Sequence, residues 1–242
     1  MKPVVIIAAV PTETLLLEQA LEGASRVAGS VFPAVLGTLG SLPVVVCVGG
    51  VGKINAAAAT ASLIERHRPR LVINTGCAGA YPGSGLSIGD LALADCEILG
   101  DEGATTSAGW LDLQQMKMAY LEEGEGRLFN EIPLSSHAAE KALLLAGRCD
   151  LALAHGRFVT VSTCSGTLQR GEELAQRFGA LAESMEGAAV ALTCRRYGID
   201  CLEIRGISNL VEERNMAAWD IGRAVEAAQG FVLRYLQAMV ER

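Results

Sequence analysis

Two short motifs in the last third of the chain carry an acid and an amide in small-residue surroundings. Glu183–Ala189 leads into an apolar helical run, and Arg205–Asn209 closes a strand-like segment, where α/β enzymes place their sites. A carboxylate accepts hydrogen bonds from two neighbouring hydroxyls, and an amide can face the polar edge of a purine. Glu186 and Asn209 are therefore candidates for holding a nucleoside.

Each of these residues also has an ordinary structural explanation. Asn209 follows Ser208, and Ser-Asn pairs often cap the turn that ends a strand. Trp219 could line a pocket, although core packing is the default for a tryptophan. Glu186 is different, because a carboxylate packed among small residues needs partners or becomes protonated, which favours ligand binding there.

Glu13 follows the first expected strand and a Pro-Thr pair. At a strand end it could be a catalytic acid or base. It could also be an acid at the start of a helix, where it complements the helix dipole, and the sequence alone favours this second explanation.

Two glycine-rich segments also follow expected strands. Gly49–Lys53 could bind an anion at a helix N-terminus, but it lacks the dinucleotide-binding spacing and the Ser or Thr of a P-loop. Tight strand-to-helix packing is favoured for it. Asn74–Ala80 would let backbone groups approach a flat ligand, and an ordinary turn explains it about equally well.

These positions depend on strands that alternate with helical patterns. The expected strands are Val4–Ala9, Val44–Val48, Leu71–Thr75, Asp90–Asp95, Phe158–Ser162 and Cys201–Ile207. The expected helices are Lys53–Arg66, His137–Ala146, Gly171–Phe178, Gly187–Tyr197 and Ile221–Val240. Such alternation predicts an α/β fold with a largely parallel sheet covered by helices. Residues Leu99–Ile132 are polar and glycine-rich without a sustained period, so we expect a long loop with one short helix there.

Length and composition favour one α/β domain over residues 1–242. Half of the 242 residues are hydrophobic, aromatic residues are scarce, and no linker divides the chain. The formal charge of −7, with dispersed basic residues, argues against nucleic acid as a partner. No run approaches the ~18 apolar residues of a membrane span, so we expect a soluble protein.

The cysteines and histidines do not indicate metal or triad chemistry. The seven cysteines are scattered without a C-x-x-C pair, which disfavours a disulfide framework or a zinc site and suits a reducing cytoplasm. The three histidines lie beside no partnered nucleophile and show no metal-ligand spacing. We therefore expect neither a cofactor nor a metal.

Together, five segments resemble the nucleoside phosphorylase/nucleosidase superfamily in order and spacing, over nearly the whole chain. They are Ile6–Glu13, Gly49–Asn55, Asn74–Ala80, Ser184–Gly187 and Arg205–Asn209. Within the superfamily, Ser162–Thr167, Glu183–Ala189 and Arg205–Asn209, with Asp101–Gly103 and Gly109-Trp110 between, look most like the futalosine hydrolase family. The resemblance implies a three-layer α/β/α fold around a central mixed sheet and a homo-oligomer. It also implies release of hypoxanthine from futalosine in the alternative menaquinone pathway.

The resemblance also implies roles for the candidate residues. Glu13 would orient and deprotonate a water that attacks the anomeric carbon, Glu186 would hold the ribose hydroxyls, and Asn209 would bind the leaving purine. The remaining substrate contacts would come from Cys77, Ala78, Gly79, Ser162, Thr163, Ser184, Met185 and Trp219, with the segment Ser162–Ser165 forming pocket wall.

Asn209 and Glu13 carry the choice between branches of the superfamily. By the same resemblance, methylthioadenosine/S-adenosylhomocysteine nucleosidases have Asp at the position of Asn209, where it acts as an acid toward adenine. An amide sets no negative charge against the carbonyl oxygen of hypoxanthine, so a 6-oxopurine suits Asn209 better. Phosphate-using relatives carry arginines where this chain has Glu13 and Asn74–Gly76, which favours hydrolysis over phosphorolysis.

Some alternatives stay open at the level of sequence. The chain could be an adenine-releasing nucleosidase, or a nucleoside-binding protein that has lost catalysis. A cationic residue should meet the aromatic carboxylate beyond the ribose of futalosine, and Arg214 and Lys117 are the candidates. The Leu99–Ile132 segment could close over the site.

Overall fold

The structure is a computed structural model that describes residues 1–27, 29, 31–123 and 126–240. Its strands are β1 (Val4–Ala8), β2 (Glu22–Arg26), β3 (Ala34–Leu39), β4 (Leu42–Val48), β5 (Leu71–Ala80), β6 (Leu91–Leu99), β7 (Ala104–Thr106), β8 (Gly109–Leu111), β9 (Leu121–Glu123), β10 (Gly126–Leu128), β11 (Glu131–Pro133), β12 (Leu153–Thr160), β13 (Ala180–Ser184) and β14 (Asp200–Leu210). Its helices are α1 (Leu15–Gln19), α2 (Lys53–His67), α3 (Ser136–Arg148), α4 (Leu168–Phe178), α5 (Gly187–Tyr197) and α6 (Ile221–Val240), with short 3-10 turns at Pro11–Glu13 and Met216–Ala218.

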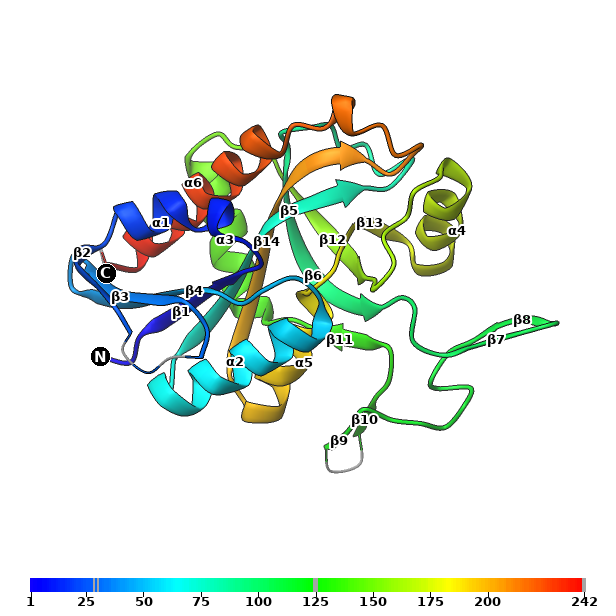
Figure 1. Cartoon of the computed structure of the whole chain (residues 1–242), viewed down its shortest axis with the longest axis horizontal. Coiled ribbons are helices and arrows are strands. Elements are labelled where there is room, and N and C mark those ends of the chain that lie inside the picture. The colour runs from blue at the N-terminus through cyan, green and yellow to red at the C-terminus, as the bar shows by residue number, and fades with distance from the viewer. Residues whose placement is uncertain (28, 30, 124–125, 241–242) are drawn as a thin grey trace.

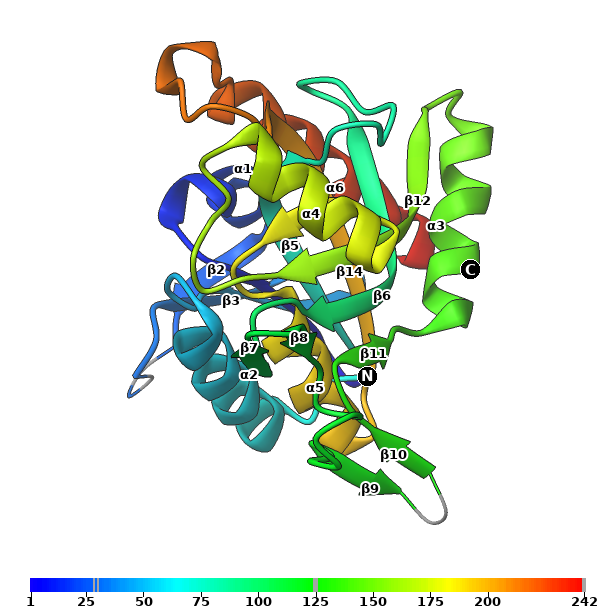
Figure 2. The ribbon, with the colours of Figure 1, turned by 90° about the vertical axis from the view of Figure 1, so that its right-hand side faces the viewer.

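Helices cover both faces of a mixed sheet, which confirms the expected α/β architecture and the mixed sheet that the resemblance implied (Figure 1). The largely parallel sheet expected from the alternation was wrong, because β2–β3, β3–β4, β5–β13, β6–β11 and β6–β14 pair antiparallel. Side chains of β1 alternate between the two faces because successive residues of a strand point in opposite directions. Val4 and Ile6 pack in a core with α1, α3 and α6, whereas Val5 and Ile7 pack in a second core with α2 and α5. Helix α4 lies over β12 and β13 through Leu174 (Figure 2).

The strand order brings several strand ends to one place. β1 pairs in parallel with β4 and β5, and β14 lies between β5 and β6, parallel to the first and antiparallel to the second. β6, β12, β13, β5 and β14 each pair with the next, so this half of the sheet closes on itself. The carboxyl ends of β1, β5 and β14 therefore meet at the same edge, where α/β folds bind ligands.

The expected elements are largely confirmed, and the main differences are in length. α5 and α6 have the predicted bounds, but β5 and β14 continue to Ala80 and Leu210. The two strands extend each other, since Gly76–Ala80 pairs with Arg205–Leu210 across a bulge at Ile207. The glycine-rich segment Asn74–Ala80 is thus part of a buried strand and not a turn.

The prediction for Leu99–Ile132 was wrong. The described residues of this segment form the hairpins β7–β8 and β9–β10 and the edge strand β11, with turns between them and no helix. The prediction also covered residues 124 and 125, which lie outside the described residues. Strands of three residues are too short to display an alternating pattern, which is why the sequence hid them.

Candidate active site

A cavity of about 250 Å³ opens where the carboxyl ends of β1, β5 and β14 meet. Most of the residues proposed from the sequence line it, from segments far apart in the chain. The lining residues are Ala9, Val10, Glu13, Val51, Cys77, Ala78, Gly79, Val161, Cys164, Ser165, Glu183, Ser184, Met185, Glu186, Arg205, Ser208, Asn209, Arg214 and Trp219.

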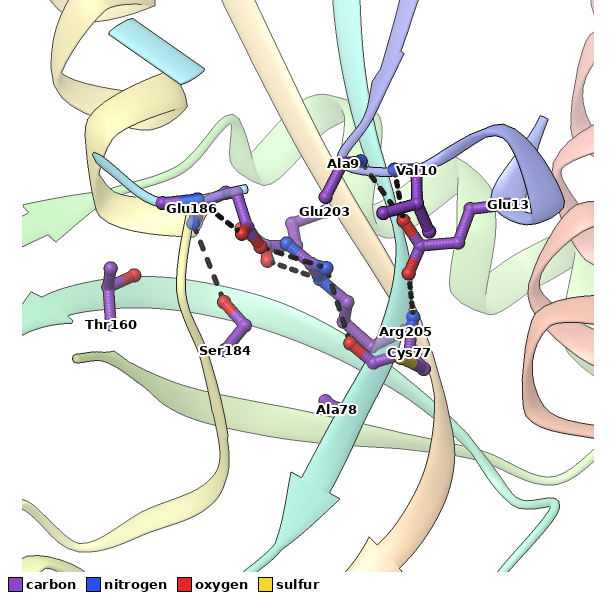
Figure 3. A network of polar contacts seen from close by, with 12 residues as sticks. Ala9, Val10, Glu13, Cys77, Ala78, Thr160, Ser184, Glu186, Glu203 and Arg205 are labelled. Carbon is purple, nitrogen blue, oxygen red and sulfur yellow. Dashed lines mark hydrogen bonds and ion pairs between the residues drawn. The ribbon is translucent and has the colours of Figure 1, made fainter. Parts of the chain in front are cut away.

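Glu13 is held in the wall of this cavity by backbone amides. Its carboxylate accepts hydrogen bonds from the amides of Ala9 (3.0 Å), Val10 (3.2 Å) and Cys77 (2.9 Å), and the side chain is buried (Figure 3). A Cβ at residue 76 would lie 2.5 Å from Glu13 Oε1, so only a glycine at Gly76 allows this approach. The three amides use three of about four acceptor positions of a carboxylate, which leaves one on Oε1 for a further donor.

Glu186 caps the start of α5 at the opposite side of the cavity. Its Oε1 accepts from the amide of Gly52 at 2.9 Å, and its Oε2 lies 3.7 Å from Arg205 Nη1. Burial raises the pKa of Glu186, while the charge of Arg205 and the Gly52 amide oppose this rise. With one strong internal hydrogen bond, the carboxylate retains acceptor positions for two donors from a ligand.

Arg205 lies in the protein interior beside Glu186 and Glu13. Its guanidinium is 1% exposed, donates from Nε to Glu203 at 2.8 Å, and reaches the carbonyl oxygen of Cys77 at 3.3 Å (Figure 3). Burial disfavours the charge, but Glu203, Glu186 and Glu13 together raise the pKa of Arg205 above its ordinary value. Arg205 therefore stays cationic and fixes the position of the acids around it.

Asn209 lies at the end of β14 with its amide oriented by its neighbours. Ser208 Oγ donates to Asn209 Oδ1 at 2.8 Å, and Asn209 Nδ2 donates to the carbonyl oxygen of Leu210 at 3.1 Å. Because an amide nitrogen carries two hydrogens, one N–H remains for a ligand. Gly79 gives the side chain room, since a Cβ there would lie 3.1 Å from Nδ2.

A further buried carboxylate fixes the loop after β12. Glu183 accepts from the Ser165 amide (2.8 Å), the Ser165 hydroxyl (2.7 Å) and the Tyr81 hydroxyl (3.0 Å). This loop contributes Cys164 and Ser165 to the cavity, whereas Ser162 and Thr163, which the sequence suggested, do not line it. Ser162 is instead hydrogen-bonded to Asp101, whose carboxylate accepts from the Ser162 amide.

One aromatic and one cationic side chain lie together at the pocket. Trp219 lines the cavity, so the default expectation of core packing was wrong for it. Arg214 lies over its ring, with the guanidinium carbon 5.0 Å from the ring centroid. Lys117, the other cationic candidate, is exposed and does not line the cavity.

The glycine-rich turn before α2 packs closely against β1, as the favoured explanation predicted, and its polar groups also pair with carboxylates of the protein. A Cβ at Gly49 would lie 3.2 Å from Ile7, and the amide of Gly52 is taken by Glu186. Lys53 pairs with Asp101 (2.6 Å) and Glu102 (2.8 Å). The positive groups of this turn thus already have protein carboxylates as partners.

The cysteines beside the cavity are not activated. Burial raises the pKa of Cys77 to about 12 and also raises that of Cys164. In the described ranges, no group of three or more His, Cys, Asp and Glu side chains is arranged to hold a metal ion. No helix among the same residues has the length and apolar character to cross a membrane.

The sequence reasoning did not assign Arg205, Ser208 or Glu183 to the site as individual residues, although it included Ser165 among the expected wall residues. One signal was present, because a charged residue within an apolar strand must find buried partners. Arg205 is such a residue in β14. The partners themselves come from other strands and could not be identified from spacing.

Comparison with known proteins establishes the family. Residues 3–237 match the profile described as Phosphorylase superfamily. The chain belongs to this superfamily. It is 35% identical over 187 residues to futalosine hydrolase of Thermus thermophilus, covering 77% of this chain and 78% of that protein. It is 31% identical over 221 residues to the 5′-methylthioadenosine/S-adenosylhomocysteine nucleosidase of Oceanobacillus iheyensis, covering 89% of each.

Solved structures of the superfamily have the same fold. The nucleosidase of Neisseria meningitidis that acts on 5′-methylthioadenosine and S-adenosylhomocysteine, in complex with methylthio-immucillin-A, has a TM-score of 0.85 at 26% identity. The match covers 98% of this chain and 100% of that one. Because its relatives in the superfamily are nucleosidases, we conclude that the chain is an enzyme of this type, an N-glycosyl hydrolase.

Proposed function

We propose that this superfamily member hydrolyses the N-ribosidic bond of futalosine and releases hypoxanthine, as a step of menaquinone biosynthesis. The observation that carries the proposal is Asn209 in the pocket with one free amide N–H. An amide donates to N7 or O6 of a 6-oxopurine without setting a carboxylate against O6. Resemblance to the Thermus thermophilus futalosine hydrolase supports the same substrate.

Glu13 acts on the water in this proposal. Glu13 lines the cavity, and the three backbone amides that bind its carboxylate leave one acceptor position free on Oε1. The ionised carboxylate of Glu13 would orient a water held there and take its proton as the water attacks the anomeric carbon. The new C–O bond forms as the C–N bond breaks. The bonding electrons leave with the purine as an anion that Asn209 hydrogen-bonds, and the purine then takes a proton from solvent water.

Glu186 binds the ribose in the same scheme. Its free acceptor positions suit the two neighbouring hydroxyls, and its negative charge stabilises the positive charge that develops on the sugar ring. Asn209 hydrogen-bonds the departing base. Ser184, Met185 and the strand Cys77–Gly79 form walls around the nucleoside.

The arrangement supports hydrolysis rather than phosphorolysis. A phosphate dianion beside the anomeric carbon would meet the carboxylate of Glu13. Of the two arginines among the lining residues, Arg205 already binds Glu203 through its Nε, and Arg214 lies over Trp219. Lys53 is likewise committed to Asp101 and Glu102.

Arg214 is our candidate for the anionic group beyond the ribose. It lines the cavity beside Trp219, so a guanidinium and an aromatic face are presented together. Such a pair suits an aryl carboxylate, with the acid on the guanidinium and the ring against the indole. Homo-oligomerisation and a cytoplasmic location stay predictions.

Adenine release from methylthioadenosine is the second candidate. It is favoured by the similarity to 5′-methylthioadenosine/S-adenosylhomocysteine nucleosidases in sequence and fold. Against it stands the amide of Asn209, which cannot act as an acid toward N7.

The test is chromatographic detection of free base after incubation with futalosine, inosine or methylthioadenosine, each with and without phosphate. We expect hypoxanthine from futalosine in both buffers, at a rate well above those with the other two nucleosides. Adenine from methylthioadenosine at a comparable rate would favour the second candidate. Strict dependence on phosphate would contradict the assignment of Glu13.

A further inference from the structure

Two carboxyl groups face each other in the interior behind the pocket. Glu97 on β6 and Glu203 on β14 are both 0% exposed. A Cβ at Gly187 would lie 2.1 Å from Glu97 Oε1 and 2.5 Å from Glu203 Oε2, so both oxygens converge over the same backbone atom. Neither oxygen has a hydrogen-bond partner in the described part of the chain outside this pair. Two ionised carboxylates in such a position would repel each other strongly, whereas one proton between them satisfies both oxygens.

The other oxygen of each acid decides where the proton resides. Glu203 Oε1 accepts a charge-assisted hydrogen bond from Nε of the Arg205 guanidinium at 2.8 Å. Glu97 Oε2 accepts from the neutral hydroxyl of Thr160 at 2.6 Å. The Thr160 oxygen in turn accepts from the amide of Ala188 at 2.7 Å. Among the described residues, the hydrogen-bond donor to Glu97 outside the acid pair is thus the uncharged hydroxyl of Thr160.

We propose that Glu97 is a protonated carboxylic acid that donates from Oε1 to Glu203 Oε2 and serves as a positioning residue for Arg205 and Glu186. The proposal rests on the proposed function where it assigns Glu186 to the substrate. The path is continuous: Glu203 binds Arg205, and Arg205 Nη1 contacts the Cys77 carbonyl and lies 3.7 Å from Glu186 Oε2.

The same acid reaches Glu186 from a second direction. Glu97 accepts a hydrogen bond from the Thr160 hydroxyl, and the Thr160 oxygen accepts one from the amide of Ala188. Ala188 lies in the first turn of α5, two residues after Glu186. Gly187 is required between them, because any side chain there would occupy the space of the two carboxyl oxygens. The acid pair thus fixes both the guanidinium beside Glu186 and the backbone that carries it.

The charges around the pair agree with a single shared proton. Burial and the charge of Glu203 raise the pKa of Glu97, and Thr160 and Arg205 oppose this rise. The other ionisable groups that interact with the pair are Glu186 at the start of α5, Tyr81 after β5 and Cys201 on β14. Arg205 is the cation among them. When the pair carries one negative charge and not two, the positive charge of Arg205 also stabilises the neighbouring acids.

Infrared spectroscopy of the protein without substrate tests the protonation directly. We expect the carbonyl stretch of a protonated carboxyl group at neutral pH in the wild type and in Glu140→Gln, a control at an exposed glutamate of α3. The band should be lost in Glu97→Gln. Absence of the band from the wild type, or its persistence in Glu97→Gln, would overturn the proposal.

Kinetics test the positioning role. Glutamine can donate to Glu203 and accept from Thr160 as the neutral acid does, so Glu97→Gln should keep kcat/KM within about 3-fold of wild type. Glu97→Ala and Glu203→Gln should lower kcat/KM by about 100-fold, as expected for a displacement of about 1 Å in the site. Equal damage by Glu97→Gln and Glu203→Gln would mean that Glu97 is needed as a charge, contrary to the proposal.

The two tests separate this inference from the proposed function. If Glu97→Ala does not fold, the infrared comparison and Glu97→Gln still decide the protonation. If the wild type cleaves a nucleoside other than futalosine, the kinetic comparison is made with that nucleoside. The infrared result depends on no substrate.

Discussion

Glu13 is the residue on which the hydrolytic chemistry depends. In Glu13→Gln an NH2 group replaces one carboxylate oxygen, which removes the base at nearly unchanged side-chain size and loses one acceptor for the backbone amides around it. We expect kcat to fall by about 100-fold or more, the usual contribution of a general base, with KM changed little. Release of hypoxanthine in steady state measures kcat, and calorimetric titration of the nucleoside measures binding. Turnover within about 10-fold of wild type would assign the base to another group.

Asn209 is the residue on which the choice of purine depends. Asn209→Asp places an acceptor 3.1 Å from the Leu210 carbonyl oxygen, where the amide now donates, and sets a charge near O6 of hypoxanthine. We expect kcat/KM for futalosine to fall by roughly 100-fold, because the site loses a donor and gains a repulsive acceptor. The ratio of methylthioadenosine to futalosine cleavage should rise. An unchanged ratio would show that Asn209 does not contact the base.

The candidate site could be predicted from the sequence only where one residue carries its own signal. Glu186 had such a signal, a carboxylate among small residues. For Glu13 the sequence alone favoured a helix-dipole role, and the resemblance to the superfamily gave Glu13 and Asn209 their roles in the site; all three line the cavity. Arg205 was noted only as part of a motif, because its importance comes from acids that β14 and the start of α5 bring to it. Contacts between distant strands leave no local pattern in a sequence.

At the scale of elements, the long helices were predictable and the short strands were not. α5 and α6 span enough turns for an apolar period to show, and their bounds agree with the prediction. β13 was missed although it carries Glu183 and Ser184, because its five residues are largely alanine, leucine and polar residues of low β-propensity. Its assignment depends on pairing with β5 and β12, which is tertiary information.

The ion pairs of Lys53 join the start of α2 to the segment after β6, so their loss should loosen that junction. Burial tends to raise the pKa of Asp101, but Lys53 and the Ser162 amide outweigh it and lower that pKa below the ordinary 3.8. Burial likewise opposes the charge of Lys53, but Asp101 and Glu102 raise its pKa above 10.5. An acid whose pKa is lowered by folding stabilises the fold at pH values above its ordinary pKa. A base whose pKa is raised by folding stabilises the fold at pH values below its ordinary pKa.

The ion pairs of Lys53 therefore stabilise the fold most between pH 3.8 and pH 10.5. Lys53→Met should reduce the free energy of unfolding by about 1 kcal/mol at neutral pH, because both groups are partly exposed. The difference from wild type should shrink as the pH falls below 3.8. Urea unfolding at neutral and acidic pH measures it, with Lys141→Met as a control on α3. A difference that stays constant down to acidic pH would exclude the ion pair as its source.

At the scale of the whole molecule, the sheet and α6 touch through a glycine of β14. A Cβ at Gly206 would lie 1.9 Å from the carbonyl oxygen of Ala224, so Gly206→Ala must push α6 away from β14, the strand that carries Asn209. We expect the free energy of unfolding to fall by about 3 kcal/mol, as for severe overpacking of a core. Gly230→Ala, in α6 with open space around it, should instead raise it by about 1 kcal/mol because alanine favours helix.

The same pair of variants tells whether the helix layer also positions the site. Gly206 immediately follows Arg205 and precedes Ser208 and Asn209, so displacement of β14 would move the residues assigned to the purine. Gly206→Ala should therefore lower kcat/KM by more than its fraction of unfolded protein explains, whereas Gly230→Ala should leave it unchanged. Chemical unfolding and base release, measured on the same preparations, decide this. Full activity in a destabilised Gly206→Ala protein would mean that packing of α6 supports the fold and not the geometry of the pocket.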